Sequence, residues 1–155
     1  MFLLVIYRNA LALATLCAVA PGASASDCLL REGQGDSCSP VVACLEPSGI
    51  WFSGRATGWN QGEVSGVLSS GARCGGTWTG RNLIGLGQAD IICDDGRRVV
   101  VFFTYLDSRT GTALGHGLSD RAERVRSWSG HAIPDHVDPA RGRGPICEGA
   151  EIPIS

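Results

Sequence analysis

The chain has no lysine, and its charges are nearly balanced. All thirteen basic side chains are arginines, and they face fifteen aspartates and glutamates, which gives a formal net charge of −2. A protein that binds nucleic acid through electrostatics carries a marked excess of positive charge. We therefore expect no nucleic-acid partner.

Long apolar runs are absent outside the amino terminus. There, Arg8 precedes an apolar segment of about ten residues, and Ala23-Ser24-Ala25 follows with the small-x-small pattern of a cleavage site. The run falls short of the roughly 20 residues that a membrane crossing requires. We expect residues 1–25 to be a signal peptide, the protein to be periplasmic or extracellular, and the mature chain to have no membrane span.

Recognised catalytic and metal-binding motifs are also missing. The sequence contains no C-x2-C pair, no Gly-x-Ser-x-Gly elbow, no phosphate loop and no dinucleotide fingerprint. His131, Asp135, His136 and Asp138 lie close together, but their spacing matches no metal signature and Pro134 prevents a helix from aligning them. We expect no cofactor, no metal and no catalytic residue, although an enzyme whose site forms only in space stays an alternative.

The cysteines predict disulfides. Cys17 falls in the signal peptide, and the even number that remains in a small exported chain is typical of a disulfide framework; these are Cys28, Cys38, Cys44, Cys74, Cys93 and Cys147. Spacing alone leaves fifteen pairings open. A hairpin register, given below, places Cys74 opposite Cys93 and predicts that bond.

The rest of the chain predicts an all-β fold. It contains 22 glycines, and short apolar runs alternate with turn residues. We expect one domain over 26–155, in which a cysteine-rich segment (26–47) precedes an antiparallel up-and-down meander (48–133) and an irregular tail (134–155). The meander has about seven strands, forms a small barrel or sandwich, and is disulfide-stapled at irregular termini; its expected strands are 50–58, 63–68, 72–79, 87–94, 97–105, 112–119 and 124–133.

The strand over 97–105 is apolar on both faces. A two-residue turn at Asp95-Gly96 makes Ala89 face Phe102, and with the neighbouring hairpins it predicts a core row of alternating large and small side chains, namely Trp78, Ala89, Phe102, Gly115 and Trp128. The alternate positions then form a second apolar face, made by Val101, Phe103, Tyr105 and Leu114. This face is either covered by the termini or is a partner surface.

A polar face of the strand over 50–58 supplies the second candidate site. Trp51, Arg55 and Trp59 alternate with core positions, so they would lie in line on one sheet face. Tryptophans so placed can stack on sugar rings, and an arginine can hold an acidic group. An envelope polysaccharide or envelope protein is the partner this pattern suggests, unless the tryptophans pack beneath the termini.

The segment Ile91-Ile-Cys-Asp-Asp-Gly-Arg-Arg-Val-Val-Val is similar to the first hairpin of the periplasmic inhibitors of C-type lysozyme. The resemblance implies a small β-barrel in which a Ser-Gly loop, here Ser129-Gly130, plugs the cleft of a wall-degrading hydrolase. The leading hypothesis from the sequence is an exported, non-catalytic binding or structural protein of the bacterial envelope. An inhibitor of this kind is the alternative.

Overall fold

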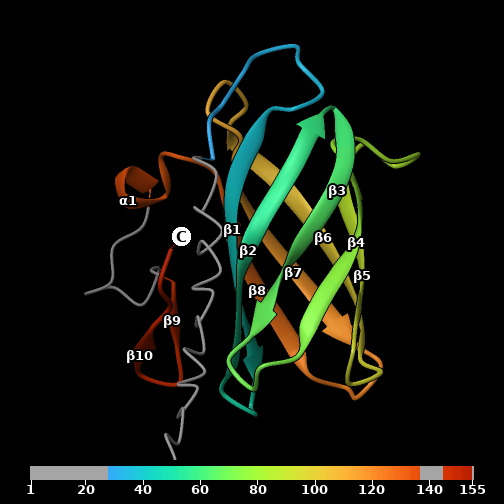
Figure 1. Ribbon diagram of the computed structural model, residues 1–155, viewed down its shortest axis with the longest axis vertical. Coiled ribbons are helices and arrows are strands. Elements are labelled where there is room, and N and C mark those ends of the chain that lie inside the picture. The colour runs from blue at the N-terminus through green and yellow to red at the C-terminus, as the bar shows by residue number, and fades with distance from the viewer. Residues whose placement is uncertain (1–27, 137–144, 155) are drawn as a thin grey trace, which may run out of the picture.

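The strands form one closed antiparallel barrel (Figure 1). The computed structural model describes residues 28–136 and 145–154, so the expected signal peptide lies outside the described residues. The barrel runs in chain order from β1 to β8 and closes where β8 pairs with β1; its strands are β1 Cys38–Glu46, β2 Ile50–Trp59, β3 Gln61–Leu68, β4 Arg73–Thr79, β5 Gly87–Cys93, β6 Arg98–Asp107, β7 Thr112–Ser119 and β8 Arg124–Ser129. The all-β meander predicted from the sequence is confirmed.

The barrel has one strand more than expected. The extra strand is β1, which lies in the segment that we predicted to be irregular. Its apolar run Val41-Val-Ala-Cys-Leu45 is short and does not alternate, because both of its faces are covered. The barrel interior covers one face, and the carboxy-terminal segment covers the other. A short apolar run without alternation cannot be assigned as a strand from the sequence alone, because the pattern does not show that both of its faces are buried.

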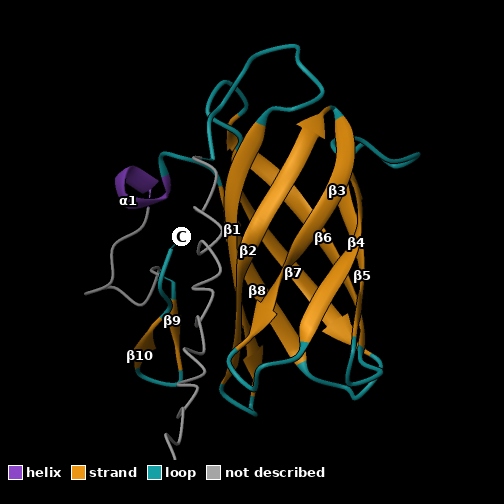
Figure 2. Cartoon of the chain, in the orientation of Figure 1, coloured by secondary structure: helices purple, strands orange, loops and turns teal. Residues whose placement is uncertain are grey.

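The carboxy-terminal segment lies against the outside of the barrel (Figure 2). It comprises the one-turn helix α1 Ile133–His136 and a small hairpin of β9 Ile146–Cys147 and β10 Ala150–Glu151. A disulfide joins Cys147 to Cys44 on β1. Apolar side chains of the barrel wall and of the carboxy-terminal segment pack together around this disulfide. We call them the outer cluster, and its buried members are Val42, Cys44, Trp128, Ile133, Cys147 and Ile152.

Two further disulfides join Cys28 to Cys38 and Cys74 to Cys93. The β4–β5 register has Cys74 opposite Cys93 and Trp78 opposite Ala89, as the sequence suggested. Three disulfides are compatible with an exported protein. Among the described residues, no helix is long and apolar enough to cross a membrane.

The register of the next hairpin differs by one residue from our prediction. Val101, not Phe102, lies opposite Ala89. The turn has three residues rather than two, because Cys93 N donates to Arg97 O and Gly96, with φ 84°, takes the left-handed position. A three-residue turn closed by a left-handed glycine is a common hairpin connection. A slip of one residue exchanges the two faces of a strand.

That exchange corrects both apolar faces proposed for the strand over 97–105. Val101, Phe103 and Tyr105 point into the barrel, whereas Phe102 lies on the outer wall and is 41% exposed. Leu114 packs against the outer cluster instead. The expected partner surface of Val101, Phe103, Tyr105 and Leu114 is therefore not one surface. The expected core row is also wrong beyond Ala89, since Gly115 pairs with Ser127 rather than Trp128.

Glycines let the sheet bend tightly enough to close. A Cβ on Gly76 would lie 1.9 Å from the carbonyl oxygen of Asp90 on β5, whereas one on the neighbouring Gly75 would meet nothing nearer than 3.8 Å. Elsewhere an aromatic ring covers glycine backbone, because a Cβ on Gly66 would lie 2.5 Å from Cζ of Phe52. Glycine kinks and aromatic rings laid over them are known devices for curving a sheet.

A candidate ligand-binding cavity

The barrel encloses a cavity of about 710 Å³ that is open at one end. Every strand of the barrel except β7 contributes side chains to its lining. An eight-stranded barrel is just wide enough either to be filled by its own side chains or to hold one small ligand. Here many inward positions carry small residues, among them Ala43, Ala56, Ala89 and Ser127, so the interior is not filled.

The deep part of the cavity is apolar. Its floor is formed by buried side chains that pack together, and these are Leu45, Phe52, Leu68, Val99 and Val125. Above the floor, Trp78 is fixed by a hydrogen bond of 3.1 Å from its indole Nε1–H to the carbonyl oxygen of Thr57. Because the polar atom of this ring already has a partner, its apolar surface is free to line the cavity.

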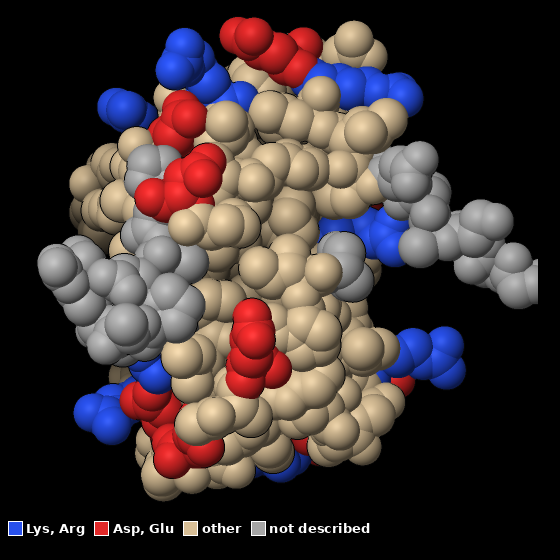
Figure 3. Space-filling view, turned by 90° about the vertical axis from the view of Figure 1, so that its left-hand side faces the viewer, with Lys and Arg blue, Asp and Glu red and all other residues tan. Residues whose placement is uncertain are grey.

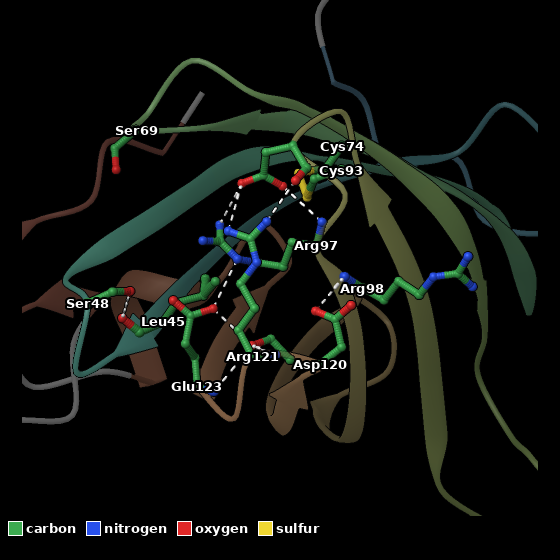
Figure 4. A network of polar contacts seen from close by, with 12 residues as sticks. Leu45, Ser48, Ser69, Cys74, Cys93, Arg97, Arg98, Asp120, Arg121 and Glu123 are labelled. Atoms are coloured by element: carbon green, nitrogen blue, oxygen red, sulfur yellow. Dashed lines mark hydrogen bonds and ion pairs between the residues drawn. A yellow bond between two sulfur atoms is a disulfide. The ribbon is translucent and has the colours of Figure 1, made fainter.

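An ion-pair network lies at the closed end, between the turns at 94–97 and 120–123 (Figure 4). Arg97 is only 3% exposed. Its Nε lies 3.0 Å from Glu123 Oε2 and its Nη1 lies 3.3 Å from Asp95 Oδ2. These two guanidinium contacts are ionic rather than well-aligned hydrogen bonds. Glu123 also accepts a hydrogen bond from Ser119 Oγ at 2.9 Å. The network therefore balances the buried charge of Arg97 at this end of the barrel.

Hydroxyl groups line one wall of the cavity. Ser39 lies on β1, and Ser127 and Ser129 lie on β8, which is the neighbour of β1. In a closed barrel of eight strands, β1 and β8 face β5 and β4, which carry Ile91 and Trp78. The cavity thus has three serine hydroxyls on one side, among apolar residues, and Ile91 and Trp78 on the other. A few polar groups on a mostly apolar wall are typical of small-molecule sites, where they fix ligand orientation.

The mouth of the cavity is lined by the amino-terminal segment and by the ends of β2, β4 and β6. Trp59 and Tyr105 supply aromatic rings there, and Tyr105 packs edge-on against Phe103 with ring centroids 5.6 Å apart. Burial raises the pKa of the Tyr105 phenol above its usual value. The residue as a whole is 39% exposed, so Tyr105 lies at the boundary between the cavity and solvent.

Charged residues of the lining lie only at the mouth, as far as the described residues show. They are Glu32 in the amino-terminal segment, Arg81 after β4 and Arg109 after β6. Arg109 Nε lies 3.8 Å from Asp107 Oδ1, and its side chain is largely exposed. The cavity thus combines an apolar interior, hydroxyls on one side and a charged rim.

The polysaccharide surface predicted on β2 is divided by the fold. Trp51 packs against the outer cluster beneath the carboxy-terminal segment, which is the alternative that the sequence left open for the tryptophans. Trp59 lines the cavity mouth at the other end of the same strand. Between them, Ser53 Oγ donates to the carbonyl oxygen of Pro153, so the tail crosses this face near Arg55. Trp51, Arg55 and Trp59 do not form one exposed row.

The loop required by the inhibitor alternative is held close to the barrel. Ser129 ends β8, and His131 Nε2 lies 2.8 Å from the carbonyl oxygen of Cys38. Ala132 N donates to Thr112 Oγ1, and Ile133 is 1% exposed. Residues 129–133 are therefore held against the barrel. Within residues 28–136 and 145–154, no three His, Cys, Asp or Glu side chains lie together as a metal site.

No family of known proteins and no curated protein matches this chain. A solved structure of a redesigned β-barrel, mFAP0, bound to DFHBI, aligns with 61% of this chain and 95% of its own at 15% identity and a TM-score of 0.48. The likeness is to a barrel of that general shape and carries no functional conclusion.

Sequence reasoning missed the cavity. Its signal was present as small residues at inward positions of several strands, such as Ala56, Gly76, Ala89 and Gly115. We interpreted alternating large and small residues as a filled interior. That interpretation depended on the predicted β5–β6 register, which placed Phe102 in the interior next to Ala89.

Proposed function

We propose that the protein is an exported, non-catalytic binding protein that takes an apolar small molecule into its barrel. The observation that carries this proposal is the open cavity of about 710 Å³ with an apolar interior. Ligand pockets usually measure about 300–1,000 Å³ and combine apolar walls with a few polar groups. The hydroxyls of Ser39 and Ser127 supply such polar groups.

The rigidity of the interior supports binding by a preformed site. Strand pairing closes the wall all round, and Phe52 and Trp78 are held by packing and by a hydrogen bond. A ligand of about 20 non-hydrogen atoms, at about 0.3 kcal/mol per atom, gains roughly 6 kcal/mol, which corresponds to a Kd on the order of tens of micromolar. Such a ligand would be detected at ordinary protein concentrations.

The cellular place we propose is the periplasm or the cell surface of a bacterium. The amino-terminal pattern with Ala23-Ser24-Ala25 and the three disulfides support this location. On the face shown in Figure 3, basic and acidic side chains are interspersed and neither sign gathers in one patch. This gives no support to binding of an anionic polymer on that face.

The test is a titration of the oxidised chain, residues 26–155, with Nile red as an apolar fluorescent probe. We expect enhanced, saturable emission that is lost in Ala56→Phe, because that ring would occupy the cavity between Ser39 and Val64. Ser65→Phe is the matched control, since it adds the same ring on the exposed face of the neighbouring strand β3.

Near-ultraviolet circular dichroism must show that both variants are folded. Absence of saturable binding by the unmodified chain would overturn the proposal. Equal binding by Ala56→Phe and Ser65→Phe would also overturn it, because the probe would then lie outside the barrel.

A further inference from the structure

The connection between β4 and β5 exposes two large aliphatic side chains, one of them completely. Leu83 and Ile84 have relative exposures of 106% and 75%, more than any other large hydrophobic residue described. Their exposures leave little side-chain surface for contact with the barrel, and the β4–β5 connection stands away from the wall in Figure 1. Adjacent aliphatic residues held in water are costly for a soluble protein, and such exposure marks an interaction site.

The loop is held in this shape by its own hydrogen bonds. Asn82 Oδ1 accepts from the backbone N–H groups of Ile84 and Leu86, at 3.0 and 3.1 Å. Asn82 N donates to Leu86 O, and Asn82 Nδ2 donates to Gln88 Oε1 on β5. The two aliphatic side chains are therefore presented by an ordered turn.

The loop lies at the mouth of the cavity. Gly80 and Arg81, which lead into it, line the opening. Two other exposed leucines occur at the same end of the barrel, Leu29 beside the start of β1 and Leu106 near the end of β6, with exposures of 52% and 44%. This end of the barrel thus exposes four large aliphatic side chains around the charged rim of the cavity.

The charge of the loop is positive. Between Thr79 and Gln88 the only charged residue is Arg81, whose side chain is exposed. Lys and Arg beside apolar side chains favour anionic lipid surfaces, each contributing roughly 1 kcal/mol near the headgroups.

We propose that the Leu83–Ile84 tip docks this end of the barrel on an anionic lipid bilayer. The tip inserts its two aliphatic side chains at the headgroup boundary, and Arg81 lies among the headgroups. A narrow tip suits a bilayer better than a rigid protein, because a stable protein interface requires about 800 Å² from each partner, whereas lipid can surround the tip. Docking in this orientation turns the cavity mouth toward the bilayer. The proposal rests on the loop and does not require that the cavity be occupied.

The experiment is flotation of the oxidised chain with vesicles of phosphatidylcholine alone, or of phosphatidylcholine and phosphatidylglycerol in equal parts. We expect flotation with the anionic vesicles, reduced roughly tenfold or more in Leu83→Ser with Ile84→Ser. The matched control is Ile92→Ser with Leu118→Ser, which removes two residues of 54% and 60% exposure on the outer wall. It should float as the unmodified chain does. Arg81→Gln should remove most of the preference for anionic vesicles.

No flotation of the unmodified chain, or equal flotation of the tip and control variants, would overturn the proposal. If instead the chain self-associates and the tip variant does not, the tip contacts a second copy and the lipid proposal is wrong. Nile red binding separates the two proposals when it is measured on the same chains before vesicles are added, because the dye itself partitions into lipid. A chain that binds the dye but not vesicles retains the proposed cavity function and loses only the docking.

Discussion

The buried ion pair between Arg97 and Glu123 gives a quantitative test of how the barrel is closed. Glu123 is 8% exposed and Arg97 3%, and the Nε–Oε2 distance is 3.0 Å. Removing one partner of a buried pair leaves an uncompensated charge and costs about 3–5 kcal/mol. We expect the lower value, about 3 kcal/mol, for either Glu123→Gln or Arg97→Met, because Asp95 and the Ser119 hydroxyl remain as partial partners.

The double variant is expected to lose much less than the sum of the two single losses. When both charges are removed, no buried charge is left, and replacement of a whole pair is often close to neutral. We therefore expect a loss of at most about 3 kcal/mol for the double variant instead of about 6, which is a coupling energy of roughly 3 kcal/mol or more.

The assay is equilibrium unfolding in guanidinium chloride at neutral pH without reductant, with the free energy of unfolding obtained for all four chains. Arg73→Met is the surface control. The Arg73–Asp94 pair is 3.8 Å long and has side chains 84% and 70% exposed, so its loss should cost less than about 1 kcal/mol. If the loss in the double variant equals the sum of the two single losses to within about 0.5 kcal/mol, Arg97 and Glu123 do not act as a pair and the reasoning is refuted.

Two other predictions concern the wall and the mouth. Gly76→Ala should lower the free energy of unfolding by about 1–3 kcal/mol, because its Cβ would meet the Asp90 carbonyl, whereas Gly75→Ala should change it little; denaturant unfolding of both variants decides this. Tyr105 is the sole tyrosine after residue 25, so the rise in absorbance of its phenolate on alkaline titration reports it directly, and we expect the midpoint above pH 10. Since its pKa is raised in the folded chain, this group favours folding most below the unfolded pKa of 10.0 and loses that contribution as pH rises through the folded value; a midpoint at or below that of a free tyrosine would contradict the burial of Tyr105.

Local sequence determined the strands and much of their order. The turn residues between apolar runs located β2 to β8, because glycine, asparagine and aspartate end strands for reasons that act within a few residues. The same local logic placed Cys74 opposite Cys93. These features depend on contacts between neighbours in the chain, so they can be inferred without the rest of the molecule.

The tertiary structure decided which face of each strand is inside. One added residue in the Asp94–Gly96 turn put Val101 and Phe103 in the barrel and Phe102 on its wall. Closure through β1 then required a partner far away in the sequence, since Val41 pairs with Ser129. The cavity exists only because small residues from separate strands meet around one axis. The sequence of one strand cannot predict this cavity, because the cavity depends on the pairing registers of all the strands around the barrel.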